Sequence, residues 1–404
     1  MSRRKKIFLS VLSALILLLL VPLGYIVYQI LETQSVVQTQ EFVEDDGDDK
    51  WDYFISDEIP EFTEETVLTG LDKPWDMGMF TDGTFILTEK PGRINYYDGE
   101  EVTVLETPSD AYIRGEGGML SLAVDPQFDQ TNYIFVCFNS ELDNEPDVRV
   151  VRYSFDKENK QLSDREDIIT GMPSNASGRH SGCQLEFGPD NNLWVGTGDA
   201  ADSSNPQDPK NLGGKILRVD RDGQAVEGNL ESPFDPRIYS YGHRNTQGLA
   251  FFDTEAGFDS LGVSVEHGSI IDDEVNNLIP GNFGWDPNPN YNEFGVPMTD
   301  RGKFPDAIPA LWSSGRSTEA TSGATIAYGS QWKAWDQALF IGVQKNKKVI
   351  VLEFNRDLTL KRETVLFEGK YGRIRTVIRG TDGHLYFLSD NGGGEDVIVR
   401  LVAE

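Results

Sequence analysis

Residues 178–199, GRHSGCQLEFGPDNNLWVGTGD, predict a β-hairpin, because two apolar strand patterns flank a turn of glycine, proline, aspartate and asparagine. His180 precedes the first strand and Asp199 follows the second. A neutral imidazole is suited to accept a proton near neutral pH, and a carboxylate on its other nitrogen would fix its tautomer. We therefore predict an active site at His180 and Asp199. A hydrogen-bonded loop histidine and a turn aspartate are the alternative.

The same pattern of a short apolar strand, a turn and a second alternating strand recurs along the chain. Its six copies begin at Met77, Leu122, Leu185, Leu249, Thr325 and Val377, roughly 45 to 75 residues apart. This spacing suits four-stranded blades with insertions, and no long stretch beyond the N-terminal apolar run shows sustained helical periodicity. The sequence predicts an all-β, six-bladed β-propeller. A pair of large β-sandwiches is the alternative.

The N-terminal part differs in composition from the rest of the chain. Residues 1–6, MSRRKK, are basic, and residues 7–31 form an almost wholly apolar run, long enough for a transmembrane helix. The basic cluster predicts that residues 1–6 are cytoplasmic and that the remainder lies outside; a cleaved signal peptide is the alternative. Residues 32–66 predict a solvated acidic linker. We expect a single-pass anchor that carries an extracytoplasmic propeller at residues 67–404.

Charge and cysteine content limit the possible partners and the stabilising chemistry. The formal net charge is −30, which argues against nucleic acid as a partner because its phosphates would be repelled. The two cysteines, Cys137 and Cys183, are too few for a disulfide-rich scaffold. They could pair in an oxidising compartment, or Cys137 could be a core residue and Cys183 a loop thiol.

Loops near the predicted hairpins carry unusual polar residues: 114–118 (RGEGG), 178–182, 242–248 (GHRNTQG) and 266–286. In a propeller, the loops at one end of the blades meet in a single pocket. The cations that would meet there and form an anion site are Arg244, Lys345, Arg373 and Arg375. Scattered surface salt bridges are the alternative. The acidic loop 266–286 offers oxygen donors of the kind that calcium takes, or is simply solvated.

In chain order the motifs are RH-S-G with a strand and GD, then GHRN-x-QG, then EHG with DDE-x-N and PGNFGW, and finally R-I-R. Together they resemble the glucose/sorbosone dehydrogenase family, from about Leu68 to Leu401. That family contains soluble aldose dehydrogenases that depend on pyrroloquinoline quinone (PQQ). The resemblance implies a six-bladed propeller, in agreement with the number of hairpins.

The resemblance also implies roles for individual residues in the reaction. His180 matches the catalytic base, Asp199 the aspartate that supports it, and Arg244 with Asn245 the pair that contacts the quinone. Arg244 would also stabilise the negative charge that grows on a quinone oxygen. The cofactor's carboxylates would be bound by Lys345, Arg373 and Arg375.

Calcium and substrate positions are carried over from the family in the same way. The carbonyls of Gly268 and Ser269 match those that hold the cofactor-linked calcium. Glu274 and the carbonyl of Phe283 match a second calcium site, and Glu116 stands where a polar residue faces the substrate. In these terms, His180 would remove the proton of the anomeric hydroxyl while hydride leaves the anomeric carbon for the quinone, giving a lactone. An external electron acceptor would then reoxidise the cofactor.

The sequence departs from the family pattern at four positions. Ser269 replaces a proline that is common after EHG, Cys183 and Gln184 replace a frequent glycine and arginine, and Ser121 interrupts the usual GLLG. None of these changes removes a predicted side-chain ligand. The alternative function is a calcium-binding extracytoplasmic propeller that acts as a binding module without enzyme activity, although it would not need the whole set of charged residues. A calcium-dependent lactonase would not explain the R-I-R pair.

Overall fold

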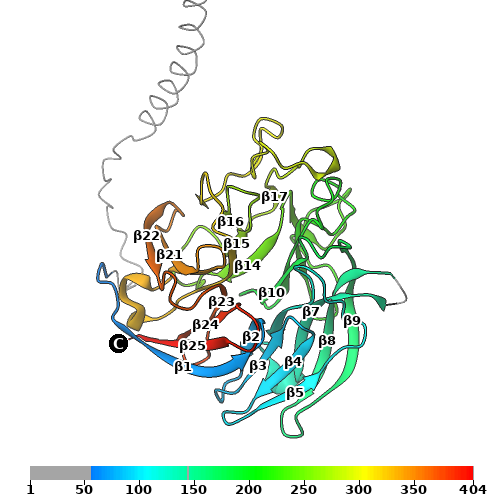
Figure 1. The fold of residues 1–404 in the computed structure, drawn as a ribbon. Coiled ribbons are helices and arrows are strands. Elements are labelled where there is room, and N and C mark those ends of the chain that lie inside the picture. The colour runs from blue at the N-terminus through cyan, green and yellow to red at the C-terminus, as the bar shows by residue number, and fades with distance from the viewer. Residues whose placement is uncertain (1–55, 143–144, 404) are drawn as a thin grey trace, which may run out of the picture. The chain divides into compact units, whose positions relative to one another are not determined.

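The computed structural model describes residues 56–142 and 145–403, whose strands form six sheets arranged around a common centre (Figure 1). The predicted six-bladed β-propeller is confirmed, and the β-sandwich alternative is wrong. The predicted membrane helix at residues 7–31 and the basic segment at 1–6 lie outside the described residues. Among residues 56–142 and 145–403, no helix is both long and apolar enough to span a bilayer.

Each blade is an antiparallel sheet of four strands, and the third blade has one additional short parallel strand. The strands of the first three blades are β2 (Pro74–Met79), β3 (Phe85–Glu89), β4 (Arg93–Tyr97) and β5 (Val102–Glu106); β6 (Met119–Val124), β7 (Tyr133–Ser140), β8 (Asp147–Asp156) and β9 (Gln161–Pro173); and β10 (Gly182–Phe187), β11 (Leu193–Thr197), β12 (Lys215–Val219), β13 (Ile238–Tyr241) and β17 (Gly281–Asn282).

The remaining blades follow the same plan, and the last one is completed by the N-terminal strand. Their strands are β14 (Thr246–Phe251), β15 (Gly262–Glu266), β16 (Glu274–Asn277) and β18 (Trp312–Ser313); β19 (Thr321–Ile326), β20 (Leu339–Val343), β21 (Lys348–Phe354) and β22 (Leu360–Leu366); and β23 (Ile374–Arg379), β24 (Leu385–Ser389), β25 (Asp396–Ala403) and β1 (Phe62–Leu71). The helices of the described residues are short: α2 (Phe128–Thr131), η2 (Pro289–Tyr291) and η3 (Ser330–Trp335).

The six predicted hairpins coincide with the first two strands of the six blades. The first strands β2, β6, β10, β14, β19 and β23 contact one another in this order, and β23 contacts β2, so that they close a ring. Each of them begins at the same end of the ring and runs to the other. The loops that precede these strands therefore gather at one end, which is the property on which the predicted pocket depends.

The pairing of β1 with β25 closes the ring between the two ends of the described chain. Phe62 pairs with Ala403 and Leu71 with Asp396. The linker predicted for residues 32–66 is therefore too long at its C-terminal end, because residues 62–66 belong to a strand. Glu64 pairs with Lys370 at 2.7 Å and Glu65 with Arg400 at 3.2 Å, so that cations of the last blade balance the acidic residues of this strand.

The core lies between neighbouring blades rather than at one centre. A separate apolar cluster fills each of the six interfaces, as between blades 1 and 2, where Ile86 and Tyr96 pack against Met119 and Phe138. Both faces of an inner strand are consequently covered, and all five residues of β3 are buried. This arrangement explains how so long a chain forms one folded unit without a single large core.

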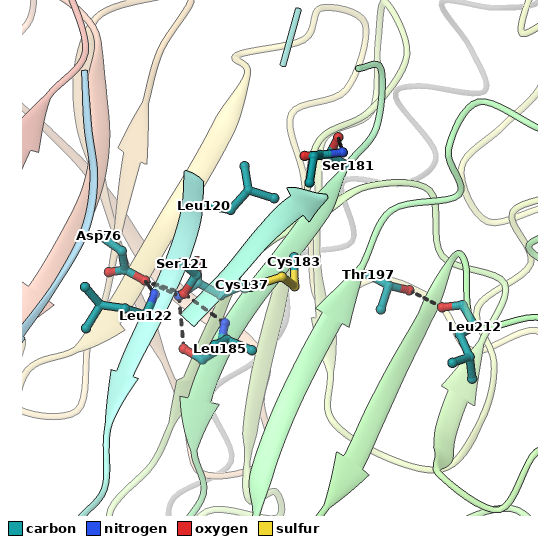
Figure 2. Close-up of a disulfide and its surroundings, with 12 residues drawn as sticks. Asp76, Leu120, Ser121, Leu122, Cys137, Ser181, Cys183, Leu185, Thr197 and Leu212 are labelled. Atoms are coloured by element: carbon teal, nitrogen blue, oxygen red, sulfur yellow. Dashed lines mark hydrogen bonds between the residues drawn. A yellow bond between two sulfur atoms is a disulfide. The ribbon is translucent and has the colours of Figure 1, made fainter. Parts of the chain in front are cut away.

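A polar network links the first three blades beneath the loop ends (Figure 2). Asp76 of β2 accepts hydrogen bonds at Oδ2 from the Ser121 hydroxyl and from Gln184 Nε2 at 3.2 Å. The Ser121 hydroxyl in turn accepts one from the Leu185 N–H at 3.0 Å. Burial raises the pKa of Asp76 to about 6, although the hydrogen bonds from Ser121, Met77 and Gln184 act in the opposite direction.

We expect Asp76→Asn to change how stability depends on pH. The pKa of Asp76 is about 6 in the folded chain and 3.8 ordinarily, so between these two pH values the native state binds more protons than the unfolded state. Its contribution to stability is greatest at low pH and is lost as the pH rises through 6. From pH 5 to pH 7.5, the free energy of unfolding of the wild type should therefore fall by about 1–2 kcal/mol more than that of Asp76→Asn. Urea unfolding at both pH values measures this difference, and parallel pH profiles would contradict it.

Candidate active site

Two glycines bring the ends of β10 and β11 together beside His180. A Cβ at Gly182 would lie 2.1 Å from Gly198 N, and a Cβ at Gly198 would lie 1.9 Å from the His180 carbonyl oxygen. Main chains can approach this closely only where both residues lack a side chain. The loop before β10 therefore lies against the residues after β11, which places His180 next to Asp199.

His180 and Asp199 form a buried pair. Nδ1 of His180 lies 2.8 Å from Oδ1 of Asp199, and the two side chains are 4% and 0% exposed. Because an ionised carboxylate can only accept a hydrogen bond, Nδ1 carries the proton and Nε2 keeps its lone pair. His180 also has a φ of 52°, a strained conformation for a residue with a side chain and one that is concentrated at functional sites. The structure thus brings together His180 and Asp199, the two residues at the ends of the 178–199 hairpin that were predicted to form the active site.

Three further groups fix the Asp199 carboxylate. Trp285 Nε1 donates to Oδ2 at 2.8 Å, the Tyr291 hydroxyl donates to Oδ2 at 2.5 Å, and the Ala201 N–H donates to Oδ1 at 2.8 Å. The Tyr291 hydroxyl also lies 2.9 Å from His180 Nδ1. Burial, followed by the Asp199 charge, raises the pKa of Tyr291, so that its hydroxyl remains a donor. No motif marks Tyr291 in the sequence.

We expect Tyr291→Phe to slow the reaction without unfolding the chain. The change removes one hydrogen bond to a buried carboxylate, and such bonds contribute about 1.5–3 kcal/mol. With Asp199 less firmly held, kcat should fall roughly tenfold or more, whereas cofactor affinity should not change. Steady-state kinetics and cofactor titration measure the two effects. Tyr97→Phe, which removes a hydroxyl bonded only to the Gly99 carbonyl, is the matched control. Equal kcat values for the two variants would contradict the assignment.

Arg244 is buried and held in one orientation next to this pair. Nε donates to Glu293 Oε1 at 2.7 Å and Nη1 to the His267 carbonyl at 2.6 Å. The Asp199 N–H donates to the Arg244 carbonyl at 2.8 Å, which ties the main chains of the two loops together. Asn245 follows and accepts a hydrogen bond at Oδ1 from Gln247 at 3.1 Å. Glu293, like Tyr291, was not predicted.

His267 lies close enough to Arg244, Arg373 and Arg375 for their charges to act on its imidazole. Burial, followed by the charges of Arg244, His180, Arg375 and Arg373, lowers the pKa of His267 to about 3. His180, Arg244 and Arg375 stand at the starts of the third, fourth and sixth blades. Gln247 connects two of these positions, because it accepts a hydrogen bond from Arg375 and donates one to Asn245, next to Arg244. The structure therefore brings Arg244 and Arg375 together next to the His180–Asp199 pair, and Arg373 adds its charge on His267, which is neutral there.

Arg375 and Arg373 differ in their surroundings. Arg375 is 4% exposed, its guanidinium lies 3.5 Å from the ring centroid of Trp75, and Nη2 donates to Gln247 Oε1 at 2.6 Å. Its Nε is buried and has no hydrogen-bond partner within the described part of the chain. Burial lowers the pKa of Arg375 to about 10. The half-exposed Arg373 donates to Gln344 Oε1 and lies 3.5 Å from Asp390 Oδ2.

Two lysines differ in their relation to the arginine cluster: Lys345 was predicted to belong to it, and Lys90 was not. Lys345 is exposed, and its main-chain N–H donates to the Glu319 carbonyl at 3.2 Å. The neighbouring Gln344, not Lys345, contacts Arg373. Lys90 Nζ donates to the Gly115 carbonyl at 2.5 Å. Burial lowers the pKa of Lys90, and the charges of Asp390, Arg375 and Glu116 also act on it. Lys90 thus belongs to the pocket, although no motif identified it.

Glu116, which the family resemblance places facing the substrate, contacts the His180 loop. Its side chain is exposed, and Oε2 accepts a hydrogen bond from the His180 N–H at 2.9 Å. The 114–118 loop therefore contacts the His180 loop directly. A carboxylate in this position can meet a ligand and also hold the main chain of His180 in its strained conformation.

The comparison with known proteins agrees with this geometry. The family model for glucose/sorbosone dehydrogenases matches residues 71–400. The chain belongs to the glucose/sorbosone dehydrogenase family. An aldose sugar dehydrogenase from Escherichia coli is 28% identical over 342 residues, which cover 82% of this chain and 91% of that protein. An uncharacterised Synechocystis protein is 29% identical and covers 85% of this chain and 87% of its own.

Solved structures extend this likeness to the fold. The PQQ-bound aldose sugar dehydrogenase of Streptomyces coelicolor superposes with a TM-score of 0.70 at 28% identity, covering 85% of this chain and all of that one. A Thermus thermophilus structure described as a putative glucose dehydrogenase gives a TM-score of 0.72 at 29% identity with the same coverage. The likeness to these two structures therefore extends over the whole length of each of them.

The calcium positions that the glucose/sorbosone dehydrogenase family suggests lie near the pocket. The Gly268 N–H donates to Asp273 Oδ1 at 2.7 Å, and Ser269 Oγ is buried without a partner in the described chain. Glu274 is buried on β16, and Phe283 stacks on His243 at 4.6 Å. Over residues 56–142 and 145–403, no three His, Cys, Asp or Glu side chains form a group that could hold a metal. Three of the four suggested ligands are main-chain carbonyls, which such a group would not include.

Proposed function

We propose that this protein is a PQQ-dependent aldose dehydrogenase that oxidises the anomeric carbon of a sugar to a lactone. The observation that carries the proposal is the buried His180–Asp199 pair beside the buried cations Arg244 and Arg375. Membership of the glucose/sorbosone dehydrogenase family supports the same reaction class. A binding module without catalysis would have no use for a base with a fixed tautomer.

The donor set fits an anionic quinone cofactor. PQQ is a planar ortho-quinone with carboxylate groups, and arginine matches carboxylates bidentately. Arg375 retains a buried Nε without a partner among the described residues, and burying an unsatisfied charged donor is costly. A bound carboxylate would satisfy it. We assign Arg244 and Asn245 to the quinone and Arg373 and Arg375 to its carboxylates. The same role for Lys345, which the sequence suggested, has less support, because Lys345 is exposed and Gln344 makes the contact with Arg373.

The residues of the chain would divide the reaction between them. When bound, the quinone supplies the hydride acceptor. His180 Nε2, left unprotonated by the hydrogen bond at Nδ1, would accept the proton of the anomeric hydroxyl. Asp199 would stabilise the imidazolium that results. Arg244, held by Glu293 and the His267 carbonyl, would place positive charge where negative charge grows on the cofactor.

A bound calcium ion would suit the acidic residues next to the pocket. Burial, followed by the charge of Glu266, raises the pKa of Glu274 well above its ordinary value. Its carboxylate accepts hydrogen bonds from the Thr299 hydroxyl at 3.1 Å and from Asn276 Nδ2 at 3.3 Å. A divalent cation would relieve the repulsion between the two carboxylates, and carbonyl and carboxylate oxygens are the ligands that calcium prefers. We assign Gly268 and Ser269, through their carbonyls, to the cofactor-linked ion, and Glu274 with the Phe283 carbonyl to a second.

We also propose an extracytoplasmic location, with residues 7–31 as a membrane anchor and an external electron acceptor that reoxidises the cofactor. The disulfide between Cys137 and Cys183 supports this location, because disulfides persist in oxidising compartments. The acidic surface, with a net formal charge of −30, does not favour nucleic acid.

The test is aldose oxidation coupled to a redox dye, with the full-length protein in detergent, reconstituted with PQQ and calcium. We expect activity that requires both additions and that EDTA removes. PQQ affinity is measured in parallel from the cofactor's absorbance, and it should fall in Arg375→Gln but not in Arg356→Gln, whose exposed side chain lies in the β21–β22 turn. A folded, calcium-loaded protein that fails to bind PQQ would overturn the proposal and favour the binding-module function.

A further inference from the structure

A second cavity lies at the opposite end of the ring of inner strands. It has a volume of about 300 Å³ and is lined by the far ends of β10, β14, β19 and β23 together with the turns that follow them. β10 leads from the His180 loop to Glu186, and β23 leads from Arg375 to Arg379. At about 3.3 Å per strand residue, the cavity is on the order of 13–20 Å from the candidate active site. Its size is at the lower limit for ligand pockets, roughly 300–1,000 Å³.

A carboxyl group and a guanidinium face this cavity without neutralising each other. The Glu186 side chain lines the cavity and is exposed to the water in it. Arg379 acts on Glu186 only through its charge; the two form no salt bridge in the chain as described. A second carboxylate, Asp253, also lines the cavity.

The Arg379 guanidinium is held in place by an aromatic ring. Its Cζ lies 3.6 Å from the ring centroid of Tyr328, a distance typical of stacked cation–π pairs. The Tyr328 hydroxyl donates to the Phe251 carbonyl, which fixes the ring itself. Stacking uses the face of the guanidinium and leaves its N–H edge free, and that edge is the part that binds carboxylates bidentately.

We propose that this cavity binds a small hydroxycarboxylate, with the ligand carboxylate on Arg379 and the ligand hydroxyls on Glu186 and Asp253. A simple anion such as acetate would meet the two acidic side chains without offering them a hydrogen-bond donor. A neutral sugar would offer donors but leave Arg379 unpaired. A ligand that carries both groups satisfies all three side chains. This site needs neither PQQ nor the reaction at His180, so it stands independently of the proposed function.

The test uses isothermal titration calorimetry on the full-length protein in detergent without PQQ, with D-gluconate as the probe and D-glucose and acetate as comparison ligands. We expect gluconate to bind with one site per chain and at least tenfold more tightly than either comparison ligand. Arg379→Gln should weaken gluconate binding about tenfold or more. Arg356→Gln, at an exposed arginine outside the cavity, should not change it.

Gluconate could instead bind to the cations of the candidate active site, and the variants separate the two locations. Binding that survives Arg379→Gln and disappears in Arg375→Gln would overturn the proposal. So would equal affinity for gluconate and acetate in the wild type. Glu186→Gln, which keeps the shape of the side chain, should weaken gluconate binding but leave acetate binding unchanged, and the reverse result would also contradict the assignment.

Discussion

Replacing His180 with alanine is expected to lower kcat for aldose oxidation about 10²- to 10⁴-fold, the usual contribution of a positioned general base. In the proposed reaction, Nε2 of His180 would accept the proton, because the hydrogen bond from Nδ1 to Asp199, at 2.8 Å, leaves it unprotonated. The affinity for PQQ should change little, because Arg244, Arg373 and Arg375 keep their own contacts. Steady-state kinetics and cofactor titration separate the two effects.

Two further variants distinguish a catalytic base from a structural histidine. Asp199→Asn presents an amide that can donate to Nδ1 and so favours the wrong tautomer, which should lower kcat by about 10²-fold or more. His384→Ala, in the turn between β23 and β24, removes a histidine outside the pocket and should leave kcat unchanged. A His180→Ala protein that retains a tenth or more of the wild-type kcat would rule out His180 as the base.

The propeller could be predicted because its inner hairpins carry a strong signal. The first two strands of each blade are buried between neighbours, so they require apolar residues and turn residues in a regular order. The closing strand β1 was missed for the opposite reason. Its sequence, FTEETVLTGL, is rich in glutamate and threonine and is typical of a solvated linker. The strand forms because it pairs along its length with β25, more than 300 residues away in the sequence, and its Glu64 and Glu65 meet the cations Lys370 and Arg400.

Some residues of the candidate site could be predicted from the sequence and others could not. His180, Asp199, Arg244 and Arg375 stand in short motifs next to predicted strands, and the ring of first strands brings them together. Tyr291 could not be predicted, because it lies in an irregular insertion 111 residues from His180. Its role depends on a contact that no local pattern records. Glu293 lies in the same insertion, and Lys90, in the short turn between β3 and β4, was missed because no motif surrounds it.

Three departures from the family pattern form one connected group in the structure. Ser121 and Gln184 both donate hydrogen bonds to Asp76, and Cys183, adjacent to Gln184, is bonded to Cys137 (Figure 2). Each change looked like an isolated substitution in the sequence. Together they join the first three blades directly beneath the His180 loop. The sequence left the pairing of the cysteines open, and the structure shows that they pair.

Breaking the Cys137–Cys183 disulfide is expected to have the largest effect on stability. The bond joins β7 of the second blade to β10 of the third across 46 residues, and both cysteines are fully buried. A cross-link over a loop of this length restricts the unfolded chain by about 4 kcal/mol, a large share of the 5–15 kcal/mol that is typical of folded domains. The urea midpoint should therefore fall sharply in Cys137→Ala/Cys183→Ala and in reduced wild-type protein.

Comparing these two samples separates the cross-link from packing. Reduced wild-type protein keeps both sulfur atoms, so its loss of stability measures the cross-link alone, whereas the double variant also loses buried volume and should be slightly less stable. Reductant should not affect the double variant. Activity at low temperature should survive in both, because the hydrogen bonds that hold the His180–Asp199 pair come from Glu116, Ala201, Trp285 and Tyr291. It should be lost at a lower temperature than in the oxidised protein. An unchanged midpoint on reduction would contradict this prediction and would mean that packing between the second and third blades, rather than the cross-link, supplies the stability at this interface.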